Sequence, residues 1–573
     1  MIDPILKIKS VNNSSVKKIT EKFVVPNLIA KIMSLRGIEN NSISKKYFYP
    51  NINNIHDPFL MLDMHKAVDR ILNAKKNNEV LLIYGDFDVD GTTATALLFN
   101  FFKSLRMNVF YYIPNRENEG YGISKAGIDY AQSIGAKLFI TCDCGINDVE
   151  QISQLNKNQI NVIITDHHKQ GERLPKSLAI LNPNRKECQY PFKGLCGAGV
   201  AFKLALAICK SGNFEKALIW KHVDLVALGI AADLVPISDE NRIIAYYGLK
   251  QFIKGTNIGL NALKKTSKLS GNKITLGQLV FRIAPKINAA GRLGDAGRSV
   301  KLMTTNNPIL AMDIAKNLED ENYKRQVITE NITNEAINFV KNNYDLEKNK
   351  AIILSNDGWH NGVIGIVASR IKELFFRPAI LISLSNKSGN RASCRSIPGF
   401  NIVDELYKVK DTLLNFGGHP MAAGFSIEKS NLQTFFNEFN NNANKTINNE
   451  IITPILYIDA EIMFSDITNR LVNFLNYLEP YGPSNSRPLF ITKNVKVIGI
   501  PKLIGKKQDV LKFNAKQSET EKECIGFNMA NNYEKLIQNK LINIVFTITE
   551  NEWNQQKNIQ LEIKNIEIGE KYA

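Results

Sequence analysis

Cysteine is scarce in this chain, and no apolar run is long enough to cross a membrane. Seven cysteines are scattered over 573 residues without a pairing pattern, which argues against a disulfide framework. The N-terminal residues MIDPILKIKS contain no apolar core of the kind that a signal peptide needs. We therefore expect neither a disulfide-rich secreted protein nor a membrane protein, but a cytoplasmic one.

Positive charge is in excess. The formal net charge is +17 at pH 7 and the isoelectric point is near 9.3, which favours a polyanionic partner such as nucleic acid. The support is modest, because lysine, asparagine and isoleucine are abundant throughout, as AT-biased coding would produce. The length exceeds what a single core accommodates, so several domains are expected.

The first half of the chain carries a parallel-sheet pattern. Apolar runs at 80–84, 108–113, 137–141, 161–165 and 178–182 alternate with helical stretches. Continuous apolar strands that alternate with helices are typical of a parallel sheet covered on both faces. In such sheets ligands bind beyond the carboxyl ends of the strands.

The rest of the chain predicts further domains. A long amphipathic stretch at 308–343 is interpreted as a connecting helix, and strand–helix–strand signals at 351–384 indicate a smaller α/β domain. The polar run at 437–450 is interpreted as a linker, and the short strands beyond it favour a β-barrel of the OB type. The predicted segments are an N-terminal segment (1–75), a catalytic α/β domain (76–240), a helical region with the connecting helix (241–345), the smaller α/β domain (346–440) and the barrel (451–573).

Three carboxylates follow the first apolar run. Asp86, Asp88 and Asp90 stand at a spacing of two, which in an extended segment puts all three side chains on one face. Three such carboxylates repel one another unless a cation lies among them. A helix start just after them gives an alternative, an N-cap, but this accounts for Asp90 alone. The cluster therefore predicts a metal site.

Further candidate ligands follow later apolar runs. Asp143 lies in FITCDCGI, and His167 and His168 lie in TDHHK, although adjacent histidines also occur in solvated turns. Carboxylate with imidazole suits a divalent ion such as Mn²⁺. Asp233 ends the apolar stretch VDLVALGIAAD, and its burial without a partner would be costly.

These segments resemble a known family. YGDFDVDGTTA, TCDCGI, TDHHK and ALGIAADLVP resemble the four motifs of the DHH phosphoesterase superfamily. WHNGVIGIVASRI and FGGHPMAAGFSI resemble its accessory DHHA1 domain. The order of these motifs, with LCGAGVAFKLA, NAAGRLGDA and a β-rich C-terminus, is similar to the RecJ family of single-strand-specific exonucleases.

The resemblance implies a two-metal nuclease. Two Mn²⁺ or Mg²⁺ ions would be held by Asp86, Asp88, Asp90, Asp143, His167 and Asp233. Asp143 would bridge the two ions, and His168 would orient the scissile phosphate. The implied activity is 5′→3′ degradation of single-stranded DNA to 5′-mononucleotides in recombinational and mismatch repair. The implied partners are a single-strand-binding protein and a helicase, and we expect a monomer.

The resemblance also implies substrate contacts. Asn288 and Arg292 would hold the DNA backbone, although Arg292 could instead pair with Asp295 at a helix end. In the second α/β domain the implied contacts are Ser393 and Arg395, followed by a turn with unhindered amides at Gly417, Gly418 and His419. In the barrel, Phe513, Phe527 and Trp553 would either stack on bases or fill the core.

Two other classes of function compete with this one. The smaller DHH enzymes hydrolyse short oligonucleotides, phosphorylated nucleotides or pyrophosphate, and lack the β-rich extension. A non-catalytic binding module is the second alternative, because some relatives have lost their metal ligands. All six expected ligands are present in this chain.

Overall fold

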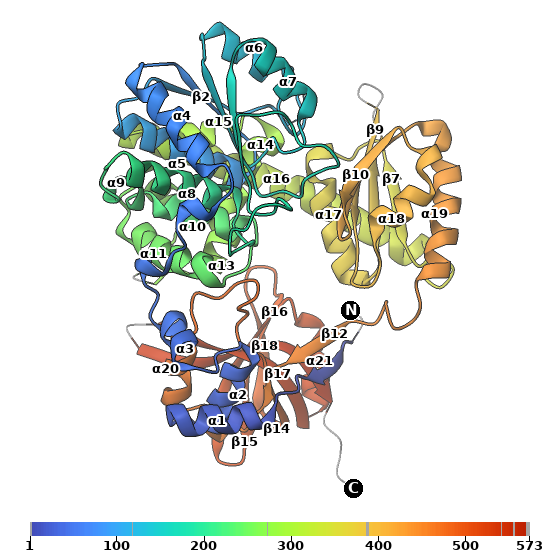
Figure 1. Cartoon of the computed structure of the whole chain (residues 1–573). Helices are drawn as coiled ribbons and strands as arrows, with labels where there is room; N and C mark the ends of the chain where they lie inside the picture. The colour runs from blue at the N-terminus through green and yellow to red at the C-terminus, as the bar shows by residue number, and fades with distance from the viewer. Residues whose placement is uncertain are drawn as a thin grey trace.

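The chain forms two lobes that lie above a barrel (Figure 1). The computed structural model describes residues 3–568, apart from 117, 272, 385–388, 540 and 554–555, and it describes only the backbone of 293, 551–553 and 556–557. No helix of this described part is long and apolar enough to span a membrane. Its seven cysteines are all buried and free.

The first lobe contains the predicted parallel sheet. Its strands are Leu81–Gly85 (β2), Val109–Tyr112 (β3), Leu138–Cys142 (β4), Asn161–Thr165 (β5) and Ala179–Leu181 (β6). They run in the order β3-β2-β4-β5-β6, and every neighbouring pair is parallel. The sequence placed all five within two residues at either end.

Helices cover both faces of this sheet, which explains the continuous apolar strands. The helices are α4 (Met64–Lys76), α5 (Val89–Ser104), α6 (Lys125–Ser133), α7 (Val149–Lys157), α8 (Gly197–Ser211) and α10 (Val223–Ala232). Along β2, Ile83 packs in a core with α4, α5, α8 and α10, whereas Leu82 and Tyr84 pack on the opposite face against α6 and α7. The helical region continues with α11 (Asp239–Lys254), α12 (Ile258–Thr266), α14 (Ala284–Leu293) and α15 (Gly297–Thr304).

One long helix, α16 (Pro308–Asn343), connects the lobes as predicted. Asn307 caps its first turn by accepting from two main-chain N–H groups, and Pro308 occupies the first position, where no N–H is needed. Its first half buries Ile314 and Leu318 in the first core, and its second half buries Ile332 and Val340 in the second lobe.

The second lobe is a mixed five-stranded sheet in the order β10-β11-β9-β8-β7. The strands are β7 (Ile352–Asn356), β8 (Ala379–Ser383), β9 (Asn390–Arg395), β10 (Asn415–His419) and β11 (Ala422–Ile427), with helices α17 (Asn361–Phe375), α18 (Ile402–Lys408) and α19 (Leu432–Thr446). The predicted linker at 437–450 is wrong, because α19 continues to Thr446. Most residues of this helix are polar, so its apolar periodicity is weak in the sequence. It buries only a narrow stripe that includes Phe435, Phe439 and Ala443.

The C-terminal region is a closed barrel, as predicted. Its strands are β14 (Phe490–Ile504), β15 (Val510–Gln517), β16 (Thr520–Phe527), β17 (Leu541–Trp553) and β18 (Gln556–Ile568), preceded by β12 (Ile455–Ile458), β13 (Ala460–Glu461) and α20 (Asn469–Tyr477), with α21 (Tyr533–Gln538) between β16 and β17. The strands pair in the cycle β14-β15-β16-β18-β17, and β17 returns to β14.

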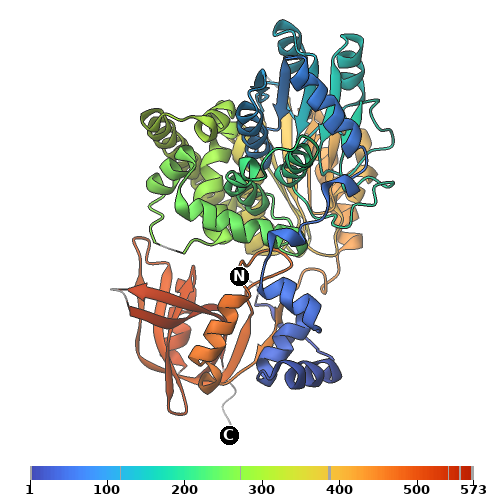
Figure 2. The ribbon, with the colours of Figure 1, turned by 60° about the vertical axis from the view of Figure 1, so that its left-hand side comes forward.

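Residues 5–48 pack on this barrel although they are far from it in sequence (Figures 1 and 2). Strand β1 (Ile5–Ile8) pairs in parallel with β12. Helices α1 (Asn13–Phe23) and α2 (Asn27–Leu35) bury Ile19, Ile32 and Met33 in the core that β14 and β15 share, and α3 (Asn41–Phe48) follows.

A buried arginine ties the barrel to the first lobe. Arg242 of α11 is 4% exposed, and its guanidinium lies 3.9 Å from the centre of the Tyr47 ring. It donates hydrogen bonds to main-chain carbonyl oxygens at the end of α3 (Tyr47) and beyond the end of α20 (Leu478, Glu479). The positive charge complements the negative ends of both helices.

Replacing Arg242 with alanine should loosen this junction. Several buried carbonyl oxygens would lose their donors, so we expect the variant to lose about 2–4 kcal/mol of stability. Thermal melting and limited proteolysis near residues 476–490 measure the effect. The control is Arg298→Ala, which removes a partly exposed pair with Glu321 and should cost about 0–1 kcal/mol. Equal melting temperatures in the two variants would refute the role given to Arg242.

Candidate metal centre and substrate cleft

Asp86, Asp88 and Asp90 lie just beyond the end of β2, so they do not share one face of a strand. The strand ends at Gly85, Asp88 is the N-cap of α5 and accepts from the Gly91 N–H, and Asp90 lies in the first helical turn. The expected extended geometry is therefore wrong. A strand end, a cap and a helix turn bring the three carboxylates together, because a tight strand-to-helix connection reverses the chain between them.

Helix α8 fixes Asp90 by its N-terminus. The main-chain N–H groups of Gly197 and Ala198 donate to the Asp90 carboxylate at 2.5 and 3.0 Å. These donors, with the positive end of the helix, stabilise a buried carboxylate that is 1% exposed. A Cβ at Gly197 would come within 2.5 Å of the Asp143 Cβ, so only glycine permits this close approach.

Asp143 and Asp233 lie close to these aspartates but come from other elements of the fold. Asp143 directly follows β4, is 2% exposed and has φ of 64°, a left-handed conformation that aspartate tolerates better than most residues. Asp233 is the C-cap of α10. The sequence anticipated both positions.

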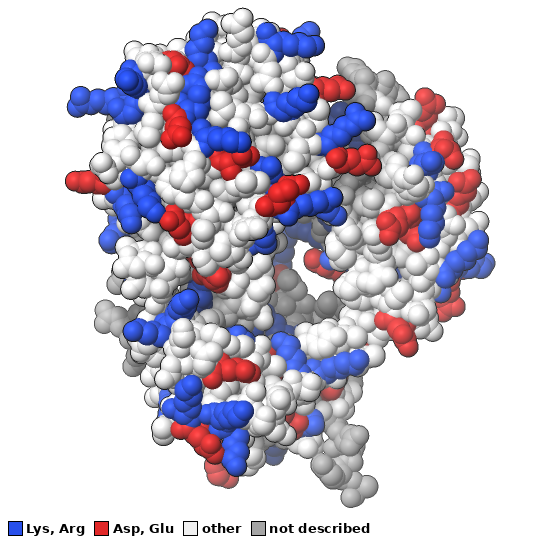
Figure 3. All heavy atoms as spheres, in the orientation of Figure 1, with Lys and Arg blue, Asp and Glu red and all other residues white. Residues whose placement is uncertain are grey.

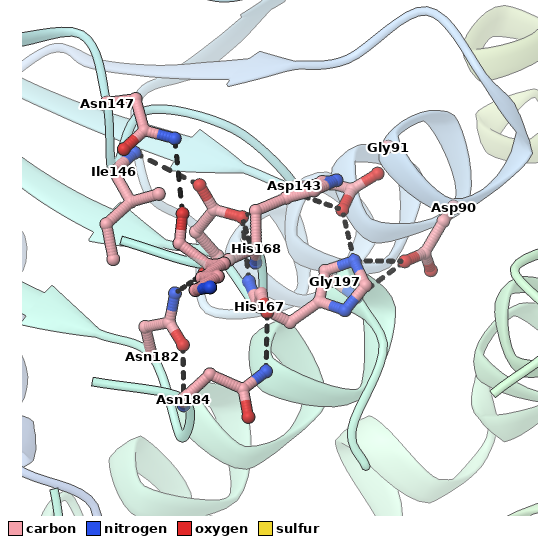
Figure 4. Close-up of polar contacts among 12 residues, drawn as sticks. Asp90, Gly91, Asp143, Ile146, Asn147, His167, His168, Asn182, Asn184 and Gly197 are labelled. Atoms are coloured by element: carbon pink, nitrogen blue, oxygen red, sulfur yellow. Dashed lines mark hydrogen bonds and ion pairs between the residues drawn. The ribbon is translucent and has the colours of Figure 1, made fainter. Parts of the chain in front are cut away.

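His167 lies between Asp90 and Asp143 (Figure 4). Its Nε2 is 3.1 Å from Asp143 Oδ1, 3.6 Å from Asp233 Oδ2 and 3.9 Å from Asp90 Oδ2. Burial lowers the pKa of His167, which favours the neutral imidazole that metals require. Within the described residues, the buried atoms Asp86 Oδ1, Asp143 Oδ1 and His167 Nε2 have no hydrogen-bond partner.

The ligand atoms form three groups that could each hold a metal ion, and two of these groups share no residue. Asp86, Asp88 and Asp143 form one group, and Asp90, His167 and Asp233 form the other, with the donor atoms of each group within 4.8 Å of one another. Asp143 and His167 also form a third group with His168. The set of oxygen and imidazole donors fits Mn²⁺ or Mg²⁺.

Burial and mutual repulsion raise the pKa of most of these carboxyl groups. The pKa values of Asp86 and Asp143 lie well above the usual range, because burial and neighbouring carboxylates disfavour the charged forms. Burial and the repulsion from Asp90 and Asp88 raise the pKa of Asp233 to about 8. A divalent cation would relieve this repulsion.

Asp166 is a site residue that the sequence analysis missed. It is 1% exposed and accepts from the main-chain N–H groups of His167, His168 and Ile146. It also hydrogen-bonds with His168 Nδ1 at 2.8 Å. Although burial lowers the pKa of His168, the hydrogen bond and charge of Asp166 raise it to about 9. The sequence did contain a signal for Asp166, because an aspartate stands directly before two histidines at the end of an apolar strand.

A cleft of about 450 Å³ lies between the two lobes beside this centre. Arg116, Arg292, Arg391 and Arg395 line it, together with Ser393. Arg391, Ser393 and Arg395 share one face of β9, and Cys394 is buried on the other. Arg116, which the sequence analysis missed, stacks on Phe87, whose neighbours are Asp86 and Asp88. Figure 3 shows the hollow between the lobes and the barrel.

The remaining predicted contacts have mixed outcomes. Arg292 donates to the Gly362 carbonyl oxygen across the cleft at 2.7 Å, and no ion pair within the described residues joins it to Asp295. Asn288 is half-buried on α14. The predicted turn at Gly417, Gly418 and His419 is wrong, because these residues form the exposed edge strand β10. In the barrel, Phe513 is buried, Phe527 is 54% exposed, and the Trp553 side chain lies outside the described residues.

Comparisons with known proteins agree with this architecture. Three family models match in sequence order: the DHH family N-terminal domain at 80–230, the DHHA1 domain at 348–445 and the RecJ OB domain at 458–565. The single-stranded-DNA-specific exonuclease RecJ of Haemophilus influenzae is 31% identical over 559 residues, which cover 94% of this chain and 96% of that protein. The chain belongs to the RecJ family.

Other RecJ proteins support the assignment. The Bacillus subtilis RecJ is 35% identical over 571 residues, 98% of this chain and 71% of that protein. The crystal structure of RecJ in complex with Mn²⁺ from Thermus thermophilus aligns with a TM-score of 0.82 and 25% identity, over 99% of this chain and 80% of that one.

The raised pKa values predict a pH dependence of stability. Above about pH 6.5 the folded, metal-free protein keeps a proton on Asp233 up to a pH of about 8 and on His168 up to a pH of about 9, whereas the unfolded chain has lost both. Stability in EDTA should therefore fall as the pH rises through this window. Thermal melting across the window measures the slope.

Asp233→Asn should flatten this decline, whereas Asp411→Asn, at an exposed position, should leave it unchanged. A melting temperature that stays constant or rises with pH in wild type would contradict the assigned shifts.

Proposed function

We propose that this chain is a metal-dependent exonuclease that degrades single-stranded DNA from the 5′ end and releases 5′-mononucleotides. The observation that carries the proposal is the pair of donor groups, Asp86–Asp88–Asp143 and Asp90–His167–Asp233, which lies beside an arginine-lined cleft. Family membership supports the substrate class, because the RecJ relatives are named as single-stranded-DNA-specific exonucleases.

The metal ligands would be these six residues, and the buried atoms of Asp86, Asp143 and His167 that have no hydrogen-bond partner fit that role. Asp143 would bridge, because it belongs to one group and lies 3.1 Å from His167 of the other. Bound divalent ions would supply a water of lowered pKa and neutralise charge on the attacking and leaving oxygens.

His168 would orient the scissile phosphate. With a pKa of about 9 it is protonated at neutral pH, and Asp166 holds its Nδ1. The protonated ring then has an Nε2–H that can donate to a phosphate oxygen. The hydroxyl of Tyr121, 3.2 Å from His168 Nδ1, further limits the ring's orientation.

The cleft arginines would bind the DNA backbone. Arg395 donates hydrogen bonds to the hydroxyl groups of Ser393 and Ser369. Burial lowers the pKa values of Arg292 and Arg395, as expected for buried guanidinium groups that have no anion beside them. A cavity of this size holds one small ligand, which favours a single strand over a duplex. Asn288, Gly417, Gly418 and His419 remain proposed contacts for other parts of the strand.

The barrel would keep the strand engaged between cuts, because OB folds bind single strands by charge and stacking. Exposed Phe527 is a candidate stacking platform. We further propose that the protein acts as a cytoplasmic monomer in recombinational and mismatch repair, with a single-strand-binding protein and a helicase that supplies unwound ends.

Asp143→Ala should abolish cleavage and keep most of the DNA affinity, because binding depends on basic residues elsewhere. The measurement uses a single-stranded oligonucleotide labelled at either end, with Mn²⁺, Mg²⁺ or EDTA. Metal-dependent release of mononucleotides from the 5′ end, absent from the variant, is the expected result. The control is Asp129→Ala, at an exposed position on α6.

Other outcomes would favour the competing classes. Turnover restricted to very short oligonucleotides would favour the smaller DHH enzymes. DNA binding by folded protein without turnover under any metal would favour a binding module. Release that starts at the 3′ end would refute the proposed polarity.

Arg395→Met should weaken substrate binding rather than metal binding. Loss of a charged hydrogen-bond donor to phosphate should raise KM for DNA by roughly tenfold or more. Lys348→Met is the control, because Lys348 is exposed on the same lobe beside Asp345. An unchanged KM, or an equal change in both variants, would show that Arg395 does not contact the DNA.

A further inference from the structure

The loop that carries both histidines has no regular secondary structure. It follows β5 and comprises residues 166–171, DHHKQG. A metal site tolerates displacements of its donors by only about 0.5 Å. An irregular surface loop therefore needs restraints that hold its main chain in place.

Asparagine amides bind three consecutive carbonyl oxygens of this loop (Figure 4). Asn184 Nδ2 donates to the His167 oxygen at 2.6 Å, and Asn182 Nδ2 donates to the His168 oxygen at 2.9 Å. From the opposite side, Asn147 Nδ2 donates to the Lys169 oxygen at 3.3 Å.

The amide oxygens of two of these asparagines also accept hydrogen bonds. Asn182 is fully buried, and its Oδ1 accepts from the Asn184 N–H at 2.7 Å. Asn147 Oδ1 accepts from the Gly171 N–H at 2.7 Å. Asn182 and Asn147 each use a donor and an acceptor on one short side chain, which asparagine supplies and aspartate does not.

The three asparagines come from the elements that flank the centre. Asn147 lies between β4 and α7, and Asn182 and Asn184 follow β6. The same two strand ends neighbour β5 in the sheet. The loop is thus fastened to the ends of both strands beside it, at the edge where Asp143 also emerges.

We propose that Asn147, Asn182 and Asn184 are positioning residues that hold His167 and His168 in the geometry required for metal binding. The inference rests on the proposed function, because it concerns the same centre. Neutral amides impose this geometry whether or not metal is bound, so the site is organised before the metal arrives. Removing the restraints should therefore weaken metal affinity more than it weakens the fold.

The test compares Asn147→Ala, Asn184→Ala and the double variant with wild type, all as full-length protein. Asn156→Ala is the matched control: it is also exposed and also donates to a main-chain oxygen, that of Lys176 at 2.6 Å, but it lies away from the histidines. Mn²⁺ affinity is measured by the electron paramagnetic resonance signal of free Mn²⁺, and the fold by melting in EDTA.

The double variant should bind Mn²⁺ about tenfold more weakly than wild type. Its kcat should fall at limiting Mn²⁺ and recover with excess Mn²⁺, while KM for DNA and the melting temperature in EDTA match those of Asn156→Ala. Mn²⁺ affinity equal to that of Asn156→Ala would overturn the positioning role and leave the proposed function intact. If wild type itself bound no Mn²⁺, both proposals would fail.

Discussion

Mutual repulsion among buried carboxylates is the constraint on which the rest of this structure depends. Buried Asp86, Asp90 and Asp143 lie together with half-buried Asp88 and Asp233 at the carboxyl edge of a parallel sheet, where burial weakens the screening that water would provide. The fold offsets only part of this cost, through the helix N-terminus that donates to Asp90. The repulsion that remains raises the pKa values of the carboxyl groups, and several buried ligand atoms have no hydrogen-bond partner. Both properties are those of a centre that binds cations.

The wider architecture follows from the need to bring a charged polymer to that edge. Helix α16 belongs to both cores and so fixes the second lobe opposite the centre, with Arg391 and Arg395 on the cleft face of β9. Arg242 fixes the barrel below through the ends of two helices. The Arg242 junction joins segments that are distant in sequence, and the two connections together set the spacing between the proposed sites for metal, phosphate and strand.

Local patterns in the sequence predicted the parts of this fold that depend on local physics. The apolar strands were found because continuous apolar runs report burial on both faces, and α16 was found because it is a long amphipathic stretch. The helix at 437–446 was missed because polar residues cover most of α19, and the strand at Gly417–His419 was missed because glycines suggest turns. The packing of residues 13–48 on the barrel has no local signal. The asparagines were missed for a similar reason: they bind main-chain groups, which every sequence offers equally. Asp166 lies in the TDHHK motif, but its hydrogen bonds to main-chain N–H groups and to the His168 ring follow from the fold.

The most direct test of this account is anomalous diffraction from crystals of the chain soaked with Mn²⁺. The account predicts two manganese peaks, one among Asp86, Asp88 and Asp143 and the other among Asp90, His167 and Asp233. Both peaks should disappear or weaken strongly in Asp143→Ala, since that residue would touch both ions. Manganese bound elsewhere on the protein, with these carboxylates unoccupied, would contradict the account.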